Sequence, residues 1–236
     1  MRTVITLIYV VFFLISSFPA AGIQWLISPK DKHRRDMMML HYVQWGFRSV
    51  EKLSGSHVAV KGLENVPTDR PVVYISNHQS IYDIVVTYSR LPGLTGFIAK
   101  QSILKVPILG YLMKRLYSLG LDRSNIRDGL KVILTAIDEV KNGISIFIYP
   151  EGTRSKDEQV HEFHAGSFKV ATKAKAPVIQ VAVKGNRNIL EYHFPNIKKS
   201  DVTLVFGKPI ETASMSREEL KELPDRVREE IITMMN

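Results

Sequence analysis

His78 and Asp83 can carry out acid–base chemistry together, and both come just after the apolar run 71–76. A short apolar run rich in Val, Ile and Tyr predicts a strand that is covered on both faces, as in parallel sheets. A neutral imidazole is a suitable general base near pH 7 when a second group fixes its tautomer and stabilises the imidazolium. On one straight helix, side chains five residues apart would point about 140° apart. We therefore expect His78 in a loop before a helix and Asp83 in its first turn, where the carboxylate can orient the imidazole.

Glu151 and Arg154 follow a second apolar run, 143–149. The ligands of open α/β sheets bind outside the carboxyl ends of the strands, so residues that follow two strands can share one site. Two further predicted strands end in the same way, at Lys100 and Arg123. Four strand ends with titratable or charged residues predict a shared cleft that contains a base and a clamp for an anion.

Each of these residues also has a purely structural explanation. Ser80 and Asp83 have the spacing of a capping box, in which the carboxylate bonds to the helix start. A histidine after a strand can be a hydrogen-bonded structural residue, cations can be solvated surface charges, and Glu151-Gly152 can be a turn. These explanations weaken because all of them would have to hold at neighbouring strand ends.

The order of the predicted elements indicates the fold class. From about residue 56 onward, short apolar runs alternate with segments of helical period, which predicts an α/β fold with a largely parallel mixed sheet flanked by helices. The expected strands lie near 57–61, 71–76, 95–100, 118–122, 143–149, 177–184 and 201–206. The expected helices lie near 80–90, 105–117, 124–141, 166–174 and 216–234.

The composition and net charge of the chain limit the kinds of molecule that it is expected to bind. The 236-residue chain is 45% hydrophobic and 23% charged, which is typical of a globular protein with a well-buried core. Its formal net charge of +9 at pH 7 favours anionic lipid headgroups or phosphorylated small molecules as partners. No nucleic-acid-binding signature accompanies the charge, so nucleic acid is not expected. The absence of cysteine excludes disulfides, thiolate nucleophiles and zinc sites with Cys ligands, and His161 and His164 lack the acidic pattern of a metal site.

The first thirty residues are unlike the rest of the chain. From Thr3 to Pro29 there is no charged residue, and basic residues follow at once. A cleaved signal peptide and a retained membrane segment both fit this pattern. Pro19 and Gly22 interrupt the apolar run, so we expect a helix from Thr3 to Ser17 that dips into a bilayer rather than a simple spanning helix.

A second amphipathic segment favours retention. Apolar residues recur at three- and four-residue steps between Met37 and Val50, which predicts a helix with one apolar face. Two apolar helices joined by a basic, Pro-containing turn are typical of a hairpin in the membrane interface. The alternative is that the second helix packs on the core of the domain. We expect a two-helix membrane segment at 1–55, monotopic or spanning the cell membrane once, and a catalytic domain at 56–236 on the cytoplasmic side.

Two stretches match motifs of a known family. Asn77-His78 with Asp83 is similar to a motif of a histidine, four residues and an aspartate, and residues 149–155 closely resemble a Pro-Glu-Gly-Thr-Arg-Ser motif. Both motifs belong to the glycerolipid acyltransferases, and the likeness runs from about residue 60 to 185. One departure is Phe-His-Ala-Gly at 163–166 where the family often has Phe-Lys-x-Gly, so a cationic contact is missing there or is replaced by His164.

The resemblance implies a glycerol-3-phosphate acyltransferase-like fold and an acyl transfer reaction without a cofactor. His78 would take the proton of the sn-2 hydroxyl of 1-acyl-sn-glycerol-3-phosphate, and Asp83 would orient the imidazole. The oxygen would attack the thioester of acyl-CoA or of an acyl carrier protein, giving phosphatidic acid. Backbone N–H groups at the start of the helix near 80–90 would stabilise the oxyanion.

The resemblance also implies the residues that bind the acceptor. The cations of the substrate-binding set would hold the phosphate, since a guanidinium suits bidentate binding, and Glu151 would place the glycerol hydroxyl or support the clamp. The expected substrate-binding residues are Lys100, Arg123, Glu151, Gly152, Thr153 and Arg154.

Three other functions stay open at this point. An acyltransferase with another lysophospholipid acceptor would have the same motifs. An exported hydrolase that uses His78 and Asp83 would have a cleaved N-terminus. A non-enzymatic module that binds anionic lipids would need only the basic surface.

Overall fold

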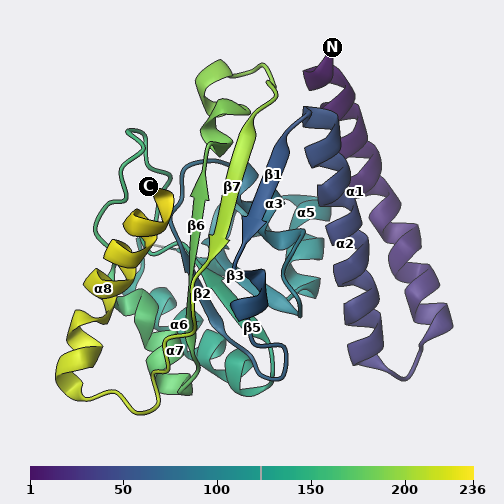
Figure 1. The fold of residues 1–236 in the computed structure, drawn as a ribbon. Helices are drawn as coiled ribbons and strands as arrows, with labels where there is room; N and C mark the ends of the chain where they lie inside the picture. Colours follow the sequence, from purple (N-terminus) through teal and green to yellow (C-terminus); the bar gives the residue numbers. More distant parts are fainter. Residues whose placement is uncertain (123) are drawn as a thin grey trace.

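A seven-stranded sheet forms the centre of the computed structural model, which describes residues 1–122 and 124–236 (Figure 1). The strands are β1 (His57–Lys61), β2 (Val73–Ser76), β3 (Thr95–Lys100), β4 (Leu119–Leu121), β5 (Ser145–Ile148), β6 (Val178–Lys184) and β7 (Asp201–Phe206). Their order across the sheet is β1-β7-β6-β2-β5-β3-β4. Every neighbouring pair is parallel except β6 with β7. The predicted α/β fold with a largely parallel mixed sheet is therefore confirmed.

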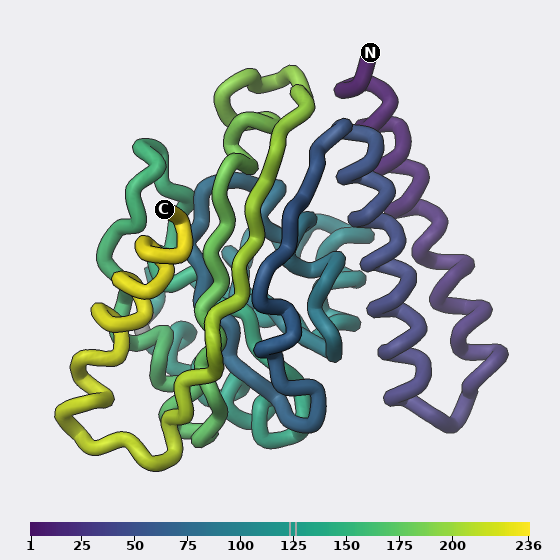
Figure 2. Tube along the Cα trace, in the orientation of Figure 1, coloured from purple at the N-terminus to yellow at the C-terminus, as the bar shows by residue number. Residues whose placement is uncertain are grey.

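Helices cover both faces of this sheet (Figures 1 and 2). One face carries α2 (Lys32–Ser54), α3 (Tyr82–Tyr88) and α5 (Pro107–Arg115), and α1 (Arg2–Ile27) packs on the outer side of α2 and α5. The other face carries α6 (Ile126–Lys141), α7 (Lys169–Ala174) and α8 (Arg217–Met235). The remaining short helices are α4 (Gln101–Leu104), η1 (Leu63–Asn65), η2 (Ala165–Phe168), η3 (Asn186–Asn188) and η4 (Glu191–His193).

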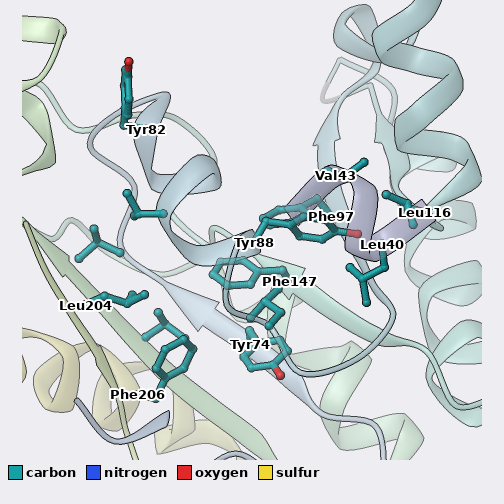
Figure 3. Packing of buried hydrophobic residues seen from close by; sticks show 14 of the residues in the cluster. Leu40, Val43, Tyr74, Tyr82, Tyr88, Phe97, Leu116, Phe147, Leu204 and Phe206 are labelled. Carbon is teal, nitrogen blue, oxygen red and sulfur yellow. The ribbon is translucent and has the colours of Figure 1, made fainter. Parts of the chain in front are cut away.

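The side chains of the central strands point alternately to the two faces of the sheet, and each face carries a hydrophobic cluster. The rings of Tyr74 and Phe147 stack with centroids 5.5 Å apart, and Phe97 stacks on Phe147 at 4.8 Å, on the face covered by α2 and α3 (Figure 3). Val73 and Ile75 point to the opposite cluster, which α6, α7 and α8 cover. Because successive side chains of a strand point to opposite faces, burial of both faces requires the unbroken apolar runs seen in the sequence.

The predicted element boundaries agree closely with the structure. The first and last residues of each predicted strand lie within two residues of those of an observed strand. The predicted helices correspond to α3, α5, α6, α7 and α8, and the start of the helix expected at 166–174 is the 3-10 helix η2. The short helix α4, which directly follows β3, was not predicted.

The first helix differs from the expectation. α1 continues through Pro19 and Gly22 to Ile27, so the predicted interruption is wrong. A proline removes one helical hydrogen bond, but tertiary packing contributes more to helix stability than intrinsic propensity does. Here Phe18 stacks on Tyr111 of α5 with centroids 5.5 Å apart, next to the proline. By length and composition, α1 is long and apolar enough to cross a membrane.

The apolar face of α2 also needs a correction. Leu40, Val43 and Val50 are buried in the cluster on the α2 and α3 side, and Met37 and Phe47 pack against it. This face therefore belongs to the core, as in the alternative considered above, and does not face lipid. Most of the exposed large apolar residues of the helix pair lie instead along α1, although Trp45 of α2 is exposed as well. Those on α1 include Val4, Leu7, Ile8, Val11, Phe12 and Ile15.

Asn77 fixes the point where the chain leaves β2, directly before His78. Its side chain is completely buried. Nδ2 donates to the Val183 carbonyl at 2.9 Å, and the Val183 N–H donates to Oδ1 at 2.9 Å. One amide side chain thus satisfies both main-chain groups of a residue in the neighbouring strand β6.

We expect Asn77→Ala to lower the free energy of unfolding by about 1–3 kcal/mol, because the Val183 N–H and carbonyl would stay buried without their partner. Denaturant or thermal unfolding of the purified protein in detergent measures this loss. The matched control is Asn142→Ala at the exposed end of α6, which should change stability by less than about 0.5 kcal/mol. Equal effects of the two substitutions would contradict the assignment.

Candidate active site

The His78 imidazole lies in the loop between β2 and α3, as the spacing to Asp83 predicted. Its Nδ1 is 2.8 Å from Asp83 Oδ2, and its ring stacks on Tyr149 with centroids 4.0 Å apart. Because Nδ1 faces a carboxylate, we place the proton of the neutral ring on Nδ1. The side chain is 17% exposed. Nε2 is therefore the nitrogen that can accept a proton from a substrate.

Asp83 is completely buried, and it combines the two functions that the sequence left as alternatives. Its Oδ2 accepts hydrogen bonds from the Gln79 N–H at 2.7 Å and the Ser80 N–H at 2.9 Å, in addition to its contact with His78. The carboxylate thus caps the start of α3 and orients the imidazole at the same time. Burial raises the pKa of Asp83 above its usual value, and the bonds from His78, Ser80 and Gln79 oppose that shift.

The loop after β5 fixes the main chain of His78. The His78 N–H donates to Glu151 Oε1 at 2.8 Å, and the Ser155 N–H donates to the His78 carbonyl at 2.7 Å. The second oxygen of Glu151 accepts from the His161 N–H at 3.3 Å. Burial raises the pKa of Glu151, and these N–H donors oppose the rise. Glu151 therefore binds the loops that form the site. Its expected function, to place the glycerol hydroxyl or to support the clamp, stays a prediction.

Arg154 lies beside the start of α3. Its Nη1 is 3.2 Å from Glu191 Oε1. The same carboxylate accepts from Ser80 Oγ at 2.6 Å and from the Ile81 N–H at 2.9 Å. The Arg154 side chain is 46% exposed and makes this contact through one nitrogen, so an incoming anion can reach it. The structure thus brings Arg154 to the same helix start that carries Asp83.

The other predicted substrate-binding residues are less closely connected. Gly152 takes a φ of 75°, which favours glycine, and Thr153 is exposed in the same turn. Lys100 is exposed at the end of β3, next to β5 in the sheet, and within the described residues it has no hydrogen bond or ion pair to the residues above. Arg123 lies outside the described residues.

The expected oxyanion donors at the start of α3 are already engaged. The Gln79 and Ser80 N–H groups donate to Asp83, the Ile81 N–H donates to Glu191, and the Tyr82 N–H donates to Ser80 Oγ at 2.9 Å. These four groups therefore do not form an oxyanion hole in this conformation, contrary to the expectation from sequence.

Three residues of the site region were not predicted from sequence. Asn77 directly precedes His78 in the first of the two family motifs. Its position at the end of a strand could have indicated a structural function. In the sequence, Tyr149 looks like one more residue of an apolar strand. In the structure its ring stacks on the imidazole and contacts Phe147 of the core. Glu191 lies more than 100 residues along the chain from Ser80 and has no local pattern that reveals the contact.

Comparison with known proteins agrees with this arrangement. The Acyltransferase family profile matches residues 57–184. A chloroplastic 1-acyl-sn-glycerol-3-phosphate acyltransferase of Brassica napus is 34% identical over 182 residues, which are 76% of this chain and 52% of that protein. A 1-acyl-sn-glycerol-3-phosphate acyltransferase of Salmonella typhimurium is 27% identical over 225 residues, which are 94% of this chain and 86% of that protein.

A solved structure resembles nearly the whole chain. The crystal structure of the 1-acyl-sn-glycerophosphate acyltransferase PlsC from Thermotoga maritima has a TM-score of 0.77 and 26% sequence identity, and the match covers 98% of each chain. The chain spans about half the length of the plant relatives that it matches. The family profile covers more than half of the 236 residues, so the chain belongs to the acyltransferase family.

Proposed function

We propose that the protein transfers an acyl group from acyl-CoA or an acyl carrier protein to the sn-2 hydroxyl of 1-acyl-sn-glycerol-3-phosphate, forming phosphatidic acid. The observation that carries this proposal is the His78–Asp83 pair, in which Nδ1 faces the carboxylate and Nε2 remains for a substrate. The names of the Salmonella and Thermotoga relatives, which match most of this chain, support the choice of acceptor.

In the proposed reaction, His78 Nε2 takes the proton of the sn-2 hydroxyl as the oxygen attacks the thioester carbonyl. Asp83 stabilises the imidazolium that forms. The tetrahedral intermediate then collapses, the carbon–sulfur bond breaks, and the imidazolium returns its proton to the thiolate that leaves. The products are phosphatidic acid and the free thiol of the donor, so atoms and charge balance without an acyl-enzyme.

The acceptor phosphate is bound by cations in this proposal. Arg154 provides a guanidinium that is bound to Glu191 beside the start of α3, and Lys100 and Arg123 are further candidates from sequence. A guanidinium can bind two phosphate oxygens at once, which fixes orientation as well as charge. Gly152 and Thr153 shape the turn that presents Arg154.

We also propose that residues 1–55 hold the catalytic region, 56–236, at the cytoplasmic surface of the membrane. The exposed apolar side chains of α1 support this, because moving such a surface from water into lipid lowers the free energy. The acceptor and the product are membrane lipids, so an enzyme at the headgroup level need not extract them fully into water.

Replacement of the general base should abolish most of the activity. We expect His78→Gln to lower kcat with 1-acyl-sn-glycerol-3-phosphate and acyl-CoA or acyl carrier protein by about 10²–10⁴-fold, the usual contribution of a general base. The exposed His57→Gln at the start of β1 is the matched control and should retain activity. A His78→Gln variant as active as the wild type would refute the enzymatic proposal and favour a lipid-binding module.

The buried carboxyl of Asp83 should make stability depend on pH. Burial raises its pKa in the folded state, so the folded protein binds this proton more tightly than the unfolded chain does. The stability from this group is therefore fully present below the unfolded pKa of about 4 and is lost as the pH rises through the folded pKa. We expect the unfolding free energy of the wild type, relative to Asp83→Asn, to fall as the pH rises above about 4. Thermal unfolding across this pH range measures the difference, and a constant or rising difference would contradict the expectation.

Removal of the proposed phosphate ligand should act on acceptor binding. A hydrogen bond to a charged group contributes about 1.5–3 kcal/mol, so Arg154→Ala should raise KM for 1-acyl-sn-glycerol-3-phosphate by about 10–100-fold. The KM for the acyl donor should change little. Arg217→Ala, an exposed substitution at the start of α8, is the control. Loss of kcat with an unchanged acceptor KM would argue against Arg154 as a phosphate ligand.

A further inference from the structure

Glu191 connects two parts of the proposed site although it lies outside the residues 57–184 that match the family profile. It belongs to η4, in the excursion between β6 and β7 that stands at the top of Figure 1. Three groups converge on its carboxylate, namely Ser80 Oγ at 2.6 Å, the Ile81 N–H at 2.9 Å and Arg154 Nη1 at 3.2 Å.

The carboxylate of Glu191 is held more firmly than the guanidinium that it binds. The Glu191 side chain is 16% exposed, whereas that of Arg154 is 46% exposed. Its contact with Ser80 involves a completely buried residue whose N–H also donates to Asp83. Glu191 is therefore fixed to the start of α3, and the arginine is fixed to Glu191.

An ordinary surface ion pair would not explain this arrangement. Exposed ion pairs contribute little to stability, because two flexible side chains must be ordered in high dielectric. Here the Glu191 carboxylate is already ordered by its hydrogen bonds with Ser80 and Ile81. The ion pair therefore restricts mainly the guanidinium of Arg154. An Arg side chain loses substantial rotamer freedom when it binds a ligand, and a partner that orders it beforehand lowers that cost.

We propose that Glu191 is a positioning residue for acceptor binding, which holds Arg154 beside the start of α3 through Nη1. A guanidinium has five N–H donors, so the remaining donors stay available to the acceptor phosphate. This inference rests on the proposed function of Arg154 as a phosphate ligand. It assigns to Glu191 an effect on KM for 1-acyl-sn-glycerol-3-phosphate that operates through Arg154.

The alternative is that Glu191 acts only as a cap for α3. A cap would influence His78 and Asp83, and its loss would reduce kcat and stability whether or not Arg154 is present. The two functions can be separated with Glu191→Gln. The amide can still bond to Ser80 and Ile81, but it has lost the negative charge that binds the guanidinium.

The test is a double-mutant cycle on the full-length protein, with 1-acyl-sn-glycerol-3-phosphate as the varied substrate. We expect Glu191→Ala to raise the acceptor KM by about tenfold, as loss of one charge-assisted contact does. In the Arg154→Ala background the same substitution should change KM by less than about twofold. Glu191→Gln should keep the thermal stability and kcat of the wild type and still raise KM. Glu222→Ala, exposed on α8, is the control for removal of an acidic side chain.

The outcomes separate the inference from the proposed function. If Arg154→Ala raises KM but Glu191→Ala raises it by the same factor with and without Arg154, Glu191 does not act through Arg154 and the inference fails alone. Full rescue of KM by Glu191→Gln would also overturn it, because a cap would then be sufficient. If Arg154→Ala leaves KM unchanged, the phosphate-binding function of Arg154 fails, and the inference fails with it.

Discussion

The site depends on the hydrogen bonds that hold the main chain of His78 to the loop after β5. Its N–H donates to Glu151, and its carbonyl accepts from the Ser155 N–H, so the backbone of the proposed base is fixed on both sides. These bonds form because β2 and β5 are parallel neighbours, with Tyr74 opposite Phe147, and both strands end at the same edge of the sheet. Any change that shifts one strand against the other would move the imidazole away from its partners. The register of two central strands is therefore part of the geometry of the proposed active site.

The hydrophobic core supports the same side chain from below. The His78 ring lies on Tyr149, Tyr149 contacts Phe147, and Phe147 packs between Tyr74 and Phe97. Burial raises the pKa of the Tyr149 hydroxyl well above its usual range, so this ring stays neutral beneath the imidazole. A continuous column of aromatic rings thus connects the centre of the sheet to the proposed base. Because protein interiors are closely packed, this column transmits the position of the strands to the imidazole with little freedom.

The sequence was sufficient for the sheet and for the pair at its edge, but not for contacts between distant segments. Strands buried on both faces leave unbroken apolar runs, and the spacing of His78 and Asp83 fits only a strand, loop and helix junction. Glu151 was predicted as part of the site, yet its bonds to main-chain N–H groups depend on where two loops meet, which no local pattern encodes. Glu191 is missed for the same reason. In α1, by contrast, the local sequence predicted a break that the structure does not have. The helix continues through Pro19, where Phe18 packs against Tyr111 of α5.

The acidic residues around the site order part of the basic surface of a chain whose net charge is +9. Asp83, Glu151 and Glu191 each accept at least one main-chain N–H, so their negative charge stabilises the loops. Only Glu191 also contacts an exposed cation, through a single nitrogen of Arg154. A basic surface without these carboxylates would attract phosphate by long-range charge alone, and that attraction is non-directional and screened by salt. In the proposed function, the carboxylates order the loops and one guanidinium, so that the attraction of the surface for the acceptor phosphate gains a defined direction beside His78.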